Sequence, residues 1–171
     1  MFKIYYGTYI DFGRNRICTN IYNFIYFLTL FYLFYSEFKR RNAKLAVKGF
    51  ALLYVLSIFL ELVILKIDFN DESQVVSYIL GGLGVIFFTF YYLLSLLNSR
   101  ESSNIFRSLL FWIVIAHFFY YLGFTPFKIG ENYFASFEKY HHLFVVKVYI
   151  TFLKCIIISF GFIWSRQNLQ S

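Results

Sequence analysis

Residues 75–97 read VVSYILGGLGVIFFTFYYLLSLL and contain no charged side chain. Roughly 20 helical residues cross the hydrocarbon core of a bilayer, which is about 30 Å thick, so this stretch is long enough to span it. Backbone N–H and C=O groups find no water inside lipid, and a run of this kind must therefore satisfy them as a helix. The stretch predicts a transmembrane helix.

Four more stretches are long and apolar enough to cross a bilayer. The polar segments between them are too short to fold alone, and 60% of the 171 residues are apolar. We therefore predict an all-α protein with a single membrane domain over residues 1–171, an integral membrane bundle of about five transmembrane helices. The spans are expected at residues 17–35, 45–65, 75–97, 105–122 and 143–164.

The longest connection, residues 123–142, contains the only proline and alternates aromatic with charged residues. This pattern is typical of a segment that lies at the depth of the lipid head groups. The 25 Phe and 16 Tyr have A/T-rich codons, and a mitochondrial or low-GC bacterial genome accounts for them without a functional demand. We expect the aromatic side chains to face lipid and to pack between helices.

The net charge of +7 comes from basic residues placed mainly where helices leave the membrane. Such residues orient a span and contact anionic head groups, so we expect lipid contacts, with cardiolipin as one candidate, and no nucleic-acid binding. The distribution favours an outer N-terminus and an inner C-terminus, where the inside is cytoplasm or matrix. The dense basic cluster consists of Lys39, Arg40, Arg41, Lys44 and Lys48.

Cys18 and Cys155 lack the spacing of a metal or disulfide motif, and small apolar filling is the expected role. The adjacent His141 and His142 have no suitably spaced third ligand, so we predict no metal site. Residues 1–16 lack the apolar core of a signal peptide and include an acidic residue, which predicts neither secretion nor import. No nucleophile, base or carboxylate arrangement indicates a catalytic centre.

Four ionisable residues lie inside the expected spans. A charge in hydrocarbon costs at least ~2.5–3.5 kcal/mol, so each needs a partner, a water path or a route to the interface. Lys147 is expected to reach the interface, whereas Lys154 should face a neighbouring helix or subunit, with Glu61 or His117 as an internal partner. For His117, a neutral ring bonded to a nearby hydroxyl or carbonyl competes with a titrating role.

The third span packs Gly81, Gly82 and Gly84 into one turn. Glycine lets a neighbouring helix approach closely, and it also weakens the helical hydrogen-bond ladder, which favours a kink or a one-turn π-bulge. Plain close packing and a functional hinge therefore both remain open. Tyr78 and Phe87 lie three residues before and three residues after this turn.

Residues 52–98 follow a recognisable order: an apolar span, a short acidic connection, a glycine-interrupted span and an Asn at its exit. This order resembles subunit 6 of the mitochondrial NADH:ubiquinone oxidoreductase, complex I. Glu72 matches the acidic position of that family, either Gly84 or the pair Gly81 and Gly82 matches its glycines, and residues 85–88 match its Val/Ile/Leu-Phe run. Asn98 matches the polar residue at the exit.

The resemblance implies a subunit of the membrane arm in the mitochondrial inner membrane, surrounded by other hydrophobic subunits. The chain would bind no cofactor alone, while the complex carries FMN, iron–sulfur clusters and ubiquinone. Its third span would switch between a regular helix and a π-bulge, coupling quinone reduction to proton translocation. The hinge or gating residues would then be Gly81, Gly82, Gly84, Tyr78 and Phe87. Glu61, Glu72, His117 and Lys154 are the candidate residues for a proton path or buried charge.

Two other functions remain open. The chain has the features of a small multi-span bacterial effector or pore protein whose basic loop contacts a soluble partner. It also has the features of a purely structural accessory subunit of another respiratory complex. Self-association would indicate the effector, and a respiratory assembly without NADH oxidation would indicate the scaffold.

Overall fold

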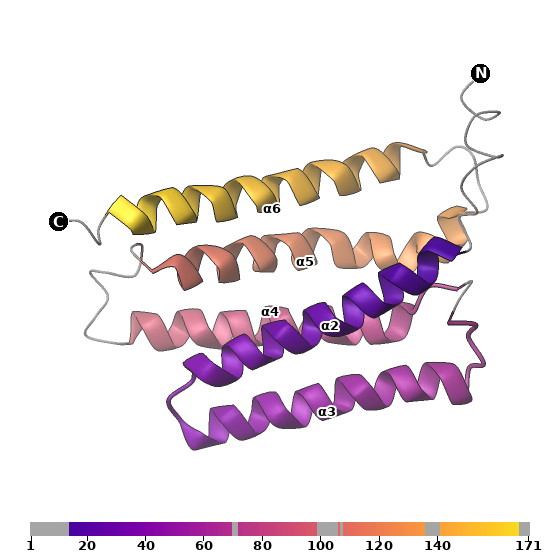
Figure 1. Ribbon diagram of the computed structural model, residues 1–171, viewed down its shortest axis with the longest axis horizontal. Helices are drawn as coiled ribbons and strands as arrows, with labels where there is room; N and C mark the ends of the chain where they lie inside the picture. Colours follow the sequence, from indigo (N-terminus) through magenta and orange to yellow (C-terminus); the bar gives the residue numbers. More distant parts are fainter. Residues whose placement is uncertain (1–13, 70–71, 99–105, 107, 136–140, 168–171) are drawn as a thin grey trace. The chain divides into compact units, whose positions relative to one another are not determined.

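The computed structural model describes residues 14–69, 72–98, 106, 108–135 and 141–167, and the regular secondary structure of these residues is helical (Figure 1). The all-α prediction is confirmed. Five helices are long and apolar enough to cross a membrane, so the chain is a multi-pass membrane protein. They are α2 (Arg14–Glu37), α3 (Arg41–Val63), α4 (Val75–Leu97), α5 (Leu109–Ala135) and α6 (His141–Gln167).

The predicted limits of α4 agree with the structure, because no polar residue interrupts residues 75–97. The prediction for α5 ends too early. Residues 123–135 continue this helix through Pro126, and its apolar part reaches Ile129. Proline interrupts helices in water but is tolerated in membrane helices, where neighbouring groups satisfy the freed backbone atoms. Part of the segment that was expected at the lipid head groups, residues 123–142, therefore belongs to α5.

The chain divides into two compact units, Met1–Gly81 and Gly82–Ser171. The division falls inside α4, between two of its three glycines. The single membrane domain stays a prediction.

In the first unit α2 and α3 form an antiparallel hairpin (Figure 1). Its core is aromatic: the ring of Phe27 lies 5.2 Å from that of Tyr54 on α3 and 5.4 Å from that of Tyr78 at the start of α4. Phe31 adds a second ring 5.9 Å from Tyr54. Each such pair contributes about 0.5–1.5 kcal/mol beyond the apolar area that it buries. The many Phe and Tyr residues therefore build this core as well as the exterior.

Helix α3 ends where Lys66 adopts a left-handed backbone conformation with φ of 52°. The amide of Leu65 donates to the carbonyl of Leu60 over 3.2 Å, and that of Ile67 donates to the carbonyl of Glu61, also over 3.2 Å. These bonds satisfy carbonyls that lose their partners at a helix end. The chain then turns back toward α4.

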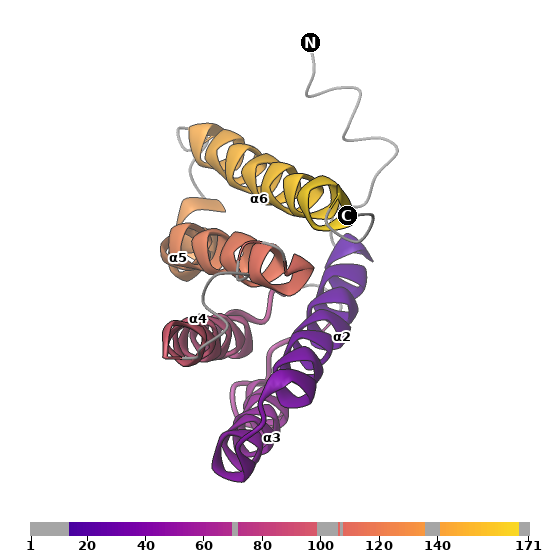
Figure 2. The ribbon, with the colours of Figure 1, turned by 90° about the vertical axis from the view of Figure 1, so that its left-hand side faces the viewer.

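In the second unit α5 and α6 lie side by side in both views (Figures 1 and 2). Glycines let them approach: a Cβ at Gly123 would lie 3.3 Å from Ile150, and one at Gly161 would overlap Trp112. The opposite side of α6 is exposed and apolar, for example at Phe152 and at Phe162. This side faces lipid or another subunit when the chain is in a membrane.

Candidate functional site

Glu61, near the end of α3, is fully buried with 0% exposure. Its Oε1 accepts a hydrogen bond of 2.7 Å from the amide of Val76, and its Oε2 accepts one of 3.1 Å from the amide of Ser77. The first amides of a helix have no partner within the helix and form its positive end. The Glu61 carboxylate therefore caps α4 and interacts with the dipole of that helix.

Asn20 on α2 holds the connection that leads into α4. It is 1% exposed, and its Nδ2 donates 3.0 Å hydrogen bonds to the carbonyls of Phe69 and Glu72. Its Oδ1 accepts a longer contact of 3.5 Å from the amide of Gln74. Glu61 and Asn20, which we call the α4 cap, thus fix the start of α4 from two other helices.

The side chains of Gln74 and Glu61 near the cap differ in whether their polar atoms have hydrogen-bond partners. The side chain of Gln74 is buried, and its Nε2 has no hydrogen-bond partner within the part of the chain that the structure describes. Both oxygens of Glu61 already accept amide hydrogens. Both carboxylate oxygens of Glu61 therefore hold the start of α4.

Gly81 lies one turn into α4 and leaves room for the ring of Phe27. A Cβ at Gly81 would lie 2.8 Å from two ring carbons of Phe27, closer than real contacts allow. The same ring packs edge-on against Tyr78, which is 6% exposed. In the first unit the glycine is thus a close-packing position, and Tyr78 belongs to the aromatic core.

Gly82 leaves room for a different helix in the second unit. A Cβ there would lie 3.1 Å from the ring of Tyr121 and 3.4 Å from Oγ1 of Thr125, both on α5. Gly84 is also buried, whereas Phe87 is 60% exposed and not packed inside the chain. A gating role for Phe87 stays a prediction, and its position fits contact with lipid or another subunit.

Helix α4 is a regular α-helix at all 23 positions from Val75 to Leu97. The structure thus has no π-bulge within these described residues. The close-packing role of Gly81 and Gly82 is evident from their neighbours, and a hinge at this turn stays a prediction.

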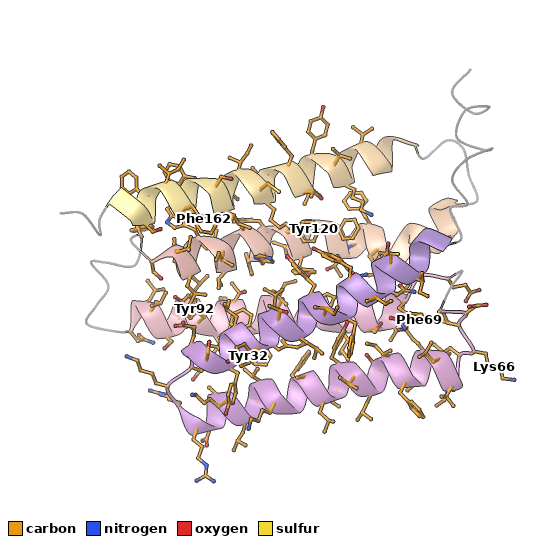
Figure 3. All side chains as sticks on the ribbon, viewed as in Figure 1. Tyr32, Lys66, Phe69, Tyr92, Tyr120 and Phe162 are labelled. Carbon is orange, nitrogen blue, oxygen red and sulfur yellow. The ribbon has the colours of Figure 1, made fainter. Side chains whose placement is uncertain are left out.

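Lys154 of α6 lies over an aromatic ring of α5. Its Nζ is 4.3 Å from the ring centroid of Tyr120, which Figure 3 labels, and it interacts electrostatically with His117. A cation over an aromatic face gains about 2 kcal/mol or more when it is desolvated. The ring thus offsets part of the cost of a charge near the middle of the span.

Lys147 repeats this arrangement two turns earlier on α6. Its Nζ lies 5.2 Å from the ring centroid of Phe124, and this ring stacks on that of Tyr120 at 5.5 Å. Lys147 is exposed, which agrees with a side chain that reaches the interface. The two lysines and Gly161 are spaced seven residues apart and form the stripe of α6 that faces α5.

His117 is 5% exposed, and its Nδ1 lies 2.6 Å from the carbonyl oxygen of Ile113. Because a carbonyl only accepts, Nδ1 carries the hydrogen, which leaves Nε2 as the acceptor of a neutral ring. Thr89 of α4 is fully buried, and its Oγ1 has no hydrogen-bond partner among the described residues. Thr89 follows Gly82 by two turns on the same face, opposite the part of α5 that holds His117.

The role predicted for Glu72, on a proton path or as a buried charge, stays a prediction. Its side chain is exposed in the connection before α4, where its backbone carbonyl accepts from Asn20. A connection between helices emerges from the apolar layer, so this carboxylate reaches water. The proposed pairing of Glu61 with Lys154 joins two separately described units and stays a prediction.

No group of three or more His, Cys, Asp or Glu able to hold a metal ion occurs in the residues that were described. Cys18 and Cys155 are both free and exposed. The side chains of His141 and His142 lie outside the described part.

Sequence reasoning missed Asn20 and the capping role of Glu61. The available signals were a polar residue early in an apolar span and an acidic residue near the end of α3, followed by a connection of only 11 residues. Such a connection brings the start of the next helix back toward that carboxylate. The aromatic partners of Lys154 and Lys147 were also missed, although a lysine in lipid needs a neighbour of some kind.

Comparisons of the chain with protein families, with curated proteins and with solved structures find no match.

Proposed function

We propose that this multi-pass membrane protein is a subunit of the membrane arm of a proton-translocating NADH:ubiquinone oxidoreductase of the complex I type, in the mitochondrial inner membrane. Its partners would be other hydrophobic subunits. The flavin, the iron–sulfur clusters and the quinone site would belong to other subunits of the complex. This chain would contribute to proton translocation through a change in the conformation of α4.

The observation that carries the proposal is the contrast in restraint along α4. Glu61 holds the amides of Val76 and Ser77, whereas the turn from Gly81 to Gly84 carries a single side chain of its own, that of Leu83. Glycine lowers the cost of changing backbone conformation, and a π-bulge adds one residue to a single helical turn. A change in hydrogen-bond register would thus occur after the fixed cap, at the glycine turn.

The second unit supplies the ionisable groups that proton coupling needs. Lys154 and His117 lie near the middle of their spans, and the buried hydroxyl of Thr89 offers one more polar group on the facing helix. Moving the part of α4 after Gly82 would change the surroundings of His117. In this proposal a water chain forms or breaks beside these three side chains.

Purification from the native membrane in mild detergent tests membership of the complex. A tagged chain is expected to co-migrate with many hydrophobic subunits in one large assembly that oxidises NADH and reduces quinone. Recovery of the chain only as a homo-oligomer would contradict the proposal. A large respiratory assembly without NADH oxidation would also contradict it.

A static structural subunit is the second candidate. It is favoured by the regular α-helical form of α4 and by the rings of Phe27 and Tyr121 that occupy the spaces beside Gly81 and Gly82. The two candidates differ in the effect of Gly82→Ala. A static role predicts less assembled complex with normal turnover per complex, whereas a moving α4 predicts normal assembly with reduced coupled turnover.

Gly49→Ala provides the matched control, because a Cβ at Gly49 would meet no heavy atom within 4 Å. This variant should change neither assembly nor turnover.

A further inference from the structure

The connection between α2 and α3 concentrates positive charge at one end of two spans. The first span ends at Glu37 and the second begins at Arg41, so the connection lies at the depth of the lipid head groups. Within the described residues 36–48, the single acidic side chain is Glu37, against five basic ones. None of the five forms an ion pair that the described residues show. They are Lys39, Arg40, Arg41, Lys44 and Lys48.

The ammonium groups of two of these lysines lie beside the ring of Tyr35. The Nζ of Lys44 lies 5.0 Å from the ring centroid and that of Lys48 lies 4.9 Å from it. The two lysines are four residues apart on α3, where like charges repel each other on a helix surface. The ring partly offsets this repulsion, and an anion placed between the two ammonium groups would remove it.

The start of α3 adds two more features that favour an anion. Its first turn contains no acidic residue, and Arg40 at the N-cap makes no side-chain hydrogen bond to the helix. The first amides of this 23-residue helix therefore remain available beside Arg40 and Arg41. A helix start attracts negative charge, and here it adds to the field of the lysines.

An apolar strip on α3 continues from the basic group toward the middle of the span. Leu45, Leu52 and Leu56 are exposed on it, by 56%, 62% and 51%. Gly49 lies within this strip, and its missing side chain leaves open space, since a Cβ there would meet nothing within 4 Å. The strip offers an acyl chain an apolar surface with open space at Gly49.

We propose that the α2–α3 connection is a binding site for an anionic phospholipid. The phosphodiester lies between Lys44 and Lys48 beside Tyr35, whose hydroxyl group is able to donate a hydrogen bond to it. One acyl chain follows the α3 strip across Gly49. A free phosphate offers the same head-group chemistry, but it does not use the apolar strip. The site does not depend on which assembly contains the chain.

Native mass spectrometry of the purified full-length chain, with equal amounts of phosphatidylglycerol and phosphatidylcholine added in detergent, tests the proposal. The wild-type chain should retain phosphatidylglycerol in clear preference. The double variant Lys44→Gln/Lys48→Gln should lose this preference by at least about tenfold, since each basic residue near a membrane surface contributes about 1 kcal/mol. Equal retention of both lipids by the wild-type chain would overturn the proposal.

Lys66→Gln/Lys147→Gln is the charge-matched control, because it removes two lysines outside the α2–α3 connection. It should keep the wild-type preference, and an equal loss would show a non-specific charge effect and overturn the site. Gly49→Leu keeps every charge and fills the acyl gap, so it should weaken retention of phosphatidylglycerol.

Inorganic phosphate separates the two sources of the anion. Millimolar phosphate should fail to displace the lipid, because it lacks the acyl chain. Displacement, together with an unchanged Gly49→Leu variant, would assign the site to free phosphate and would contradict the proposal.

Discussion

The two units hold the polar side chains of their spans in different ways. In the first unit Glu61 and Asn20 bond to backbone atoms, which fixes the connection and the start of α4. In the second unit Lys147 and Lys154 lie over the rings of Phe124 and Tyr120. Hydrogen bonds to backbone amides require one geometry, whereas a cation over a ring tolerates movement. The first arrangement anchors the start of a helix, and the second places two lysine charges of α6 against aromatic rings of α5.

The close contact between α5 and α6 gives the largest expected effect. Gly161→Val places a branched side chain against Trp112, where even a Cβ would overlap. Overpacking of this kind costs about 1–3 kcal/mol, and β-branching adds strain in a helix. The free energy of unfolding in mixed detergent micelles should fall by the upper part of this range.

Gly49→Ala is the control for helix propensity, since Gly49 has open space around it. Exchanging an exposed helical glycine for alanine stabilises a helix by about 1 kcal/mol or less. If Gly161→Val were as harmless as Gly49→Ala, the two helices would not pack as described.

The α4 cap gives an intermediate effect. Glu61→Gln replaces one accepting oxygen by an amide NH₂ that cannot accept from a helix amide, so one buried N–H loses its partner. Such a loss costs about 1–3 kcal/mol. Hydrogen exchange at Val76 and Ser77 should accelerate in this variant.

Glu72→Gln is the matched control, because it makes the same chemical change on an exposed side chain. Exchange at the start of α4 should not respond to it. Equal acceleration in both variants would contradict the capping role of Glu61.

The charge over Tyr120 gives the smallest expected effect on stability. Lys154→Leu removes about 2 kcal/mol of cation–π attraction, but it also removes a charge whose burial in lipid costs about 2.5–3.5 kcal/mol. The two changes largely cancel, so the unfolding free energy should move by only about 0.5–1.5 kcal/mol. Lys154→Arg keeps the cation and is the control for side-chain volume.

A severe loss of assembly in Lys154→Leu would indicate an ionic partner instead. Rescue by neutralising Glu61 would identify that partner as the Glu61 carboxylate. Failure of the rescue would reject this pair.

The five membrane-spanning helices could be predicted from the sequence, but the partners of their polar residues could not. An uncharged run such as residues 75–97 can satisfy its backbone hydrogen bonds in lipid only as a helix. Its predicted limits therefore agree with the structure. The end of α5 was wrong because Pro126 interrupts helices in water more strongly than in a membrane. Burial of Glu61 was expected from its position, but its two amide donors come from a helix that begins beyond the next connection.

The glycine turn shows the same limit. Its three glycines indicate close approach by a neighbour, and their spacing does not identify the ring of Phe27 at Gly81 or that of Tyr121 at Gly82. Those contacts depend on how far each helix is displaced along its neighbour. An apolar sequence does not determine this displacement, because apolar side chains can pack at several offsets. A local pattern therefore predicts that a position is closely packed, but it does not identify the side chain that packs there.

In the proposed function, α4 moves at its glycine turn, after a start that Glu61 holds. The most direct measurement is the number of protons translocated per NADH oxidised by the purified, reconstituted assembly carrying Gly84→Val. A branched side chain stiffens this turn and blocks close approach, so the variant should assemble normally and translocate fewer protons per NADH. A normally assembled variant with the wild-type proton yield would contradict the account.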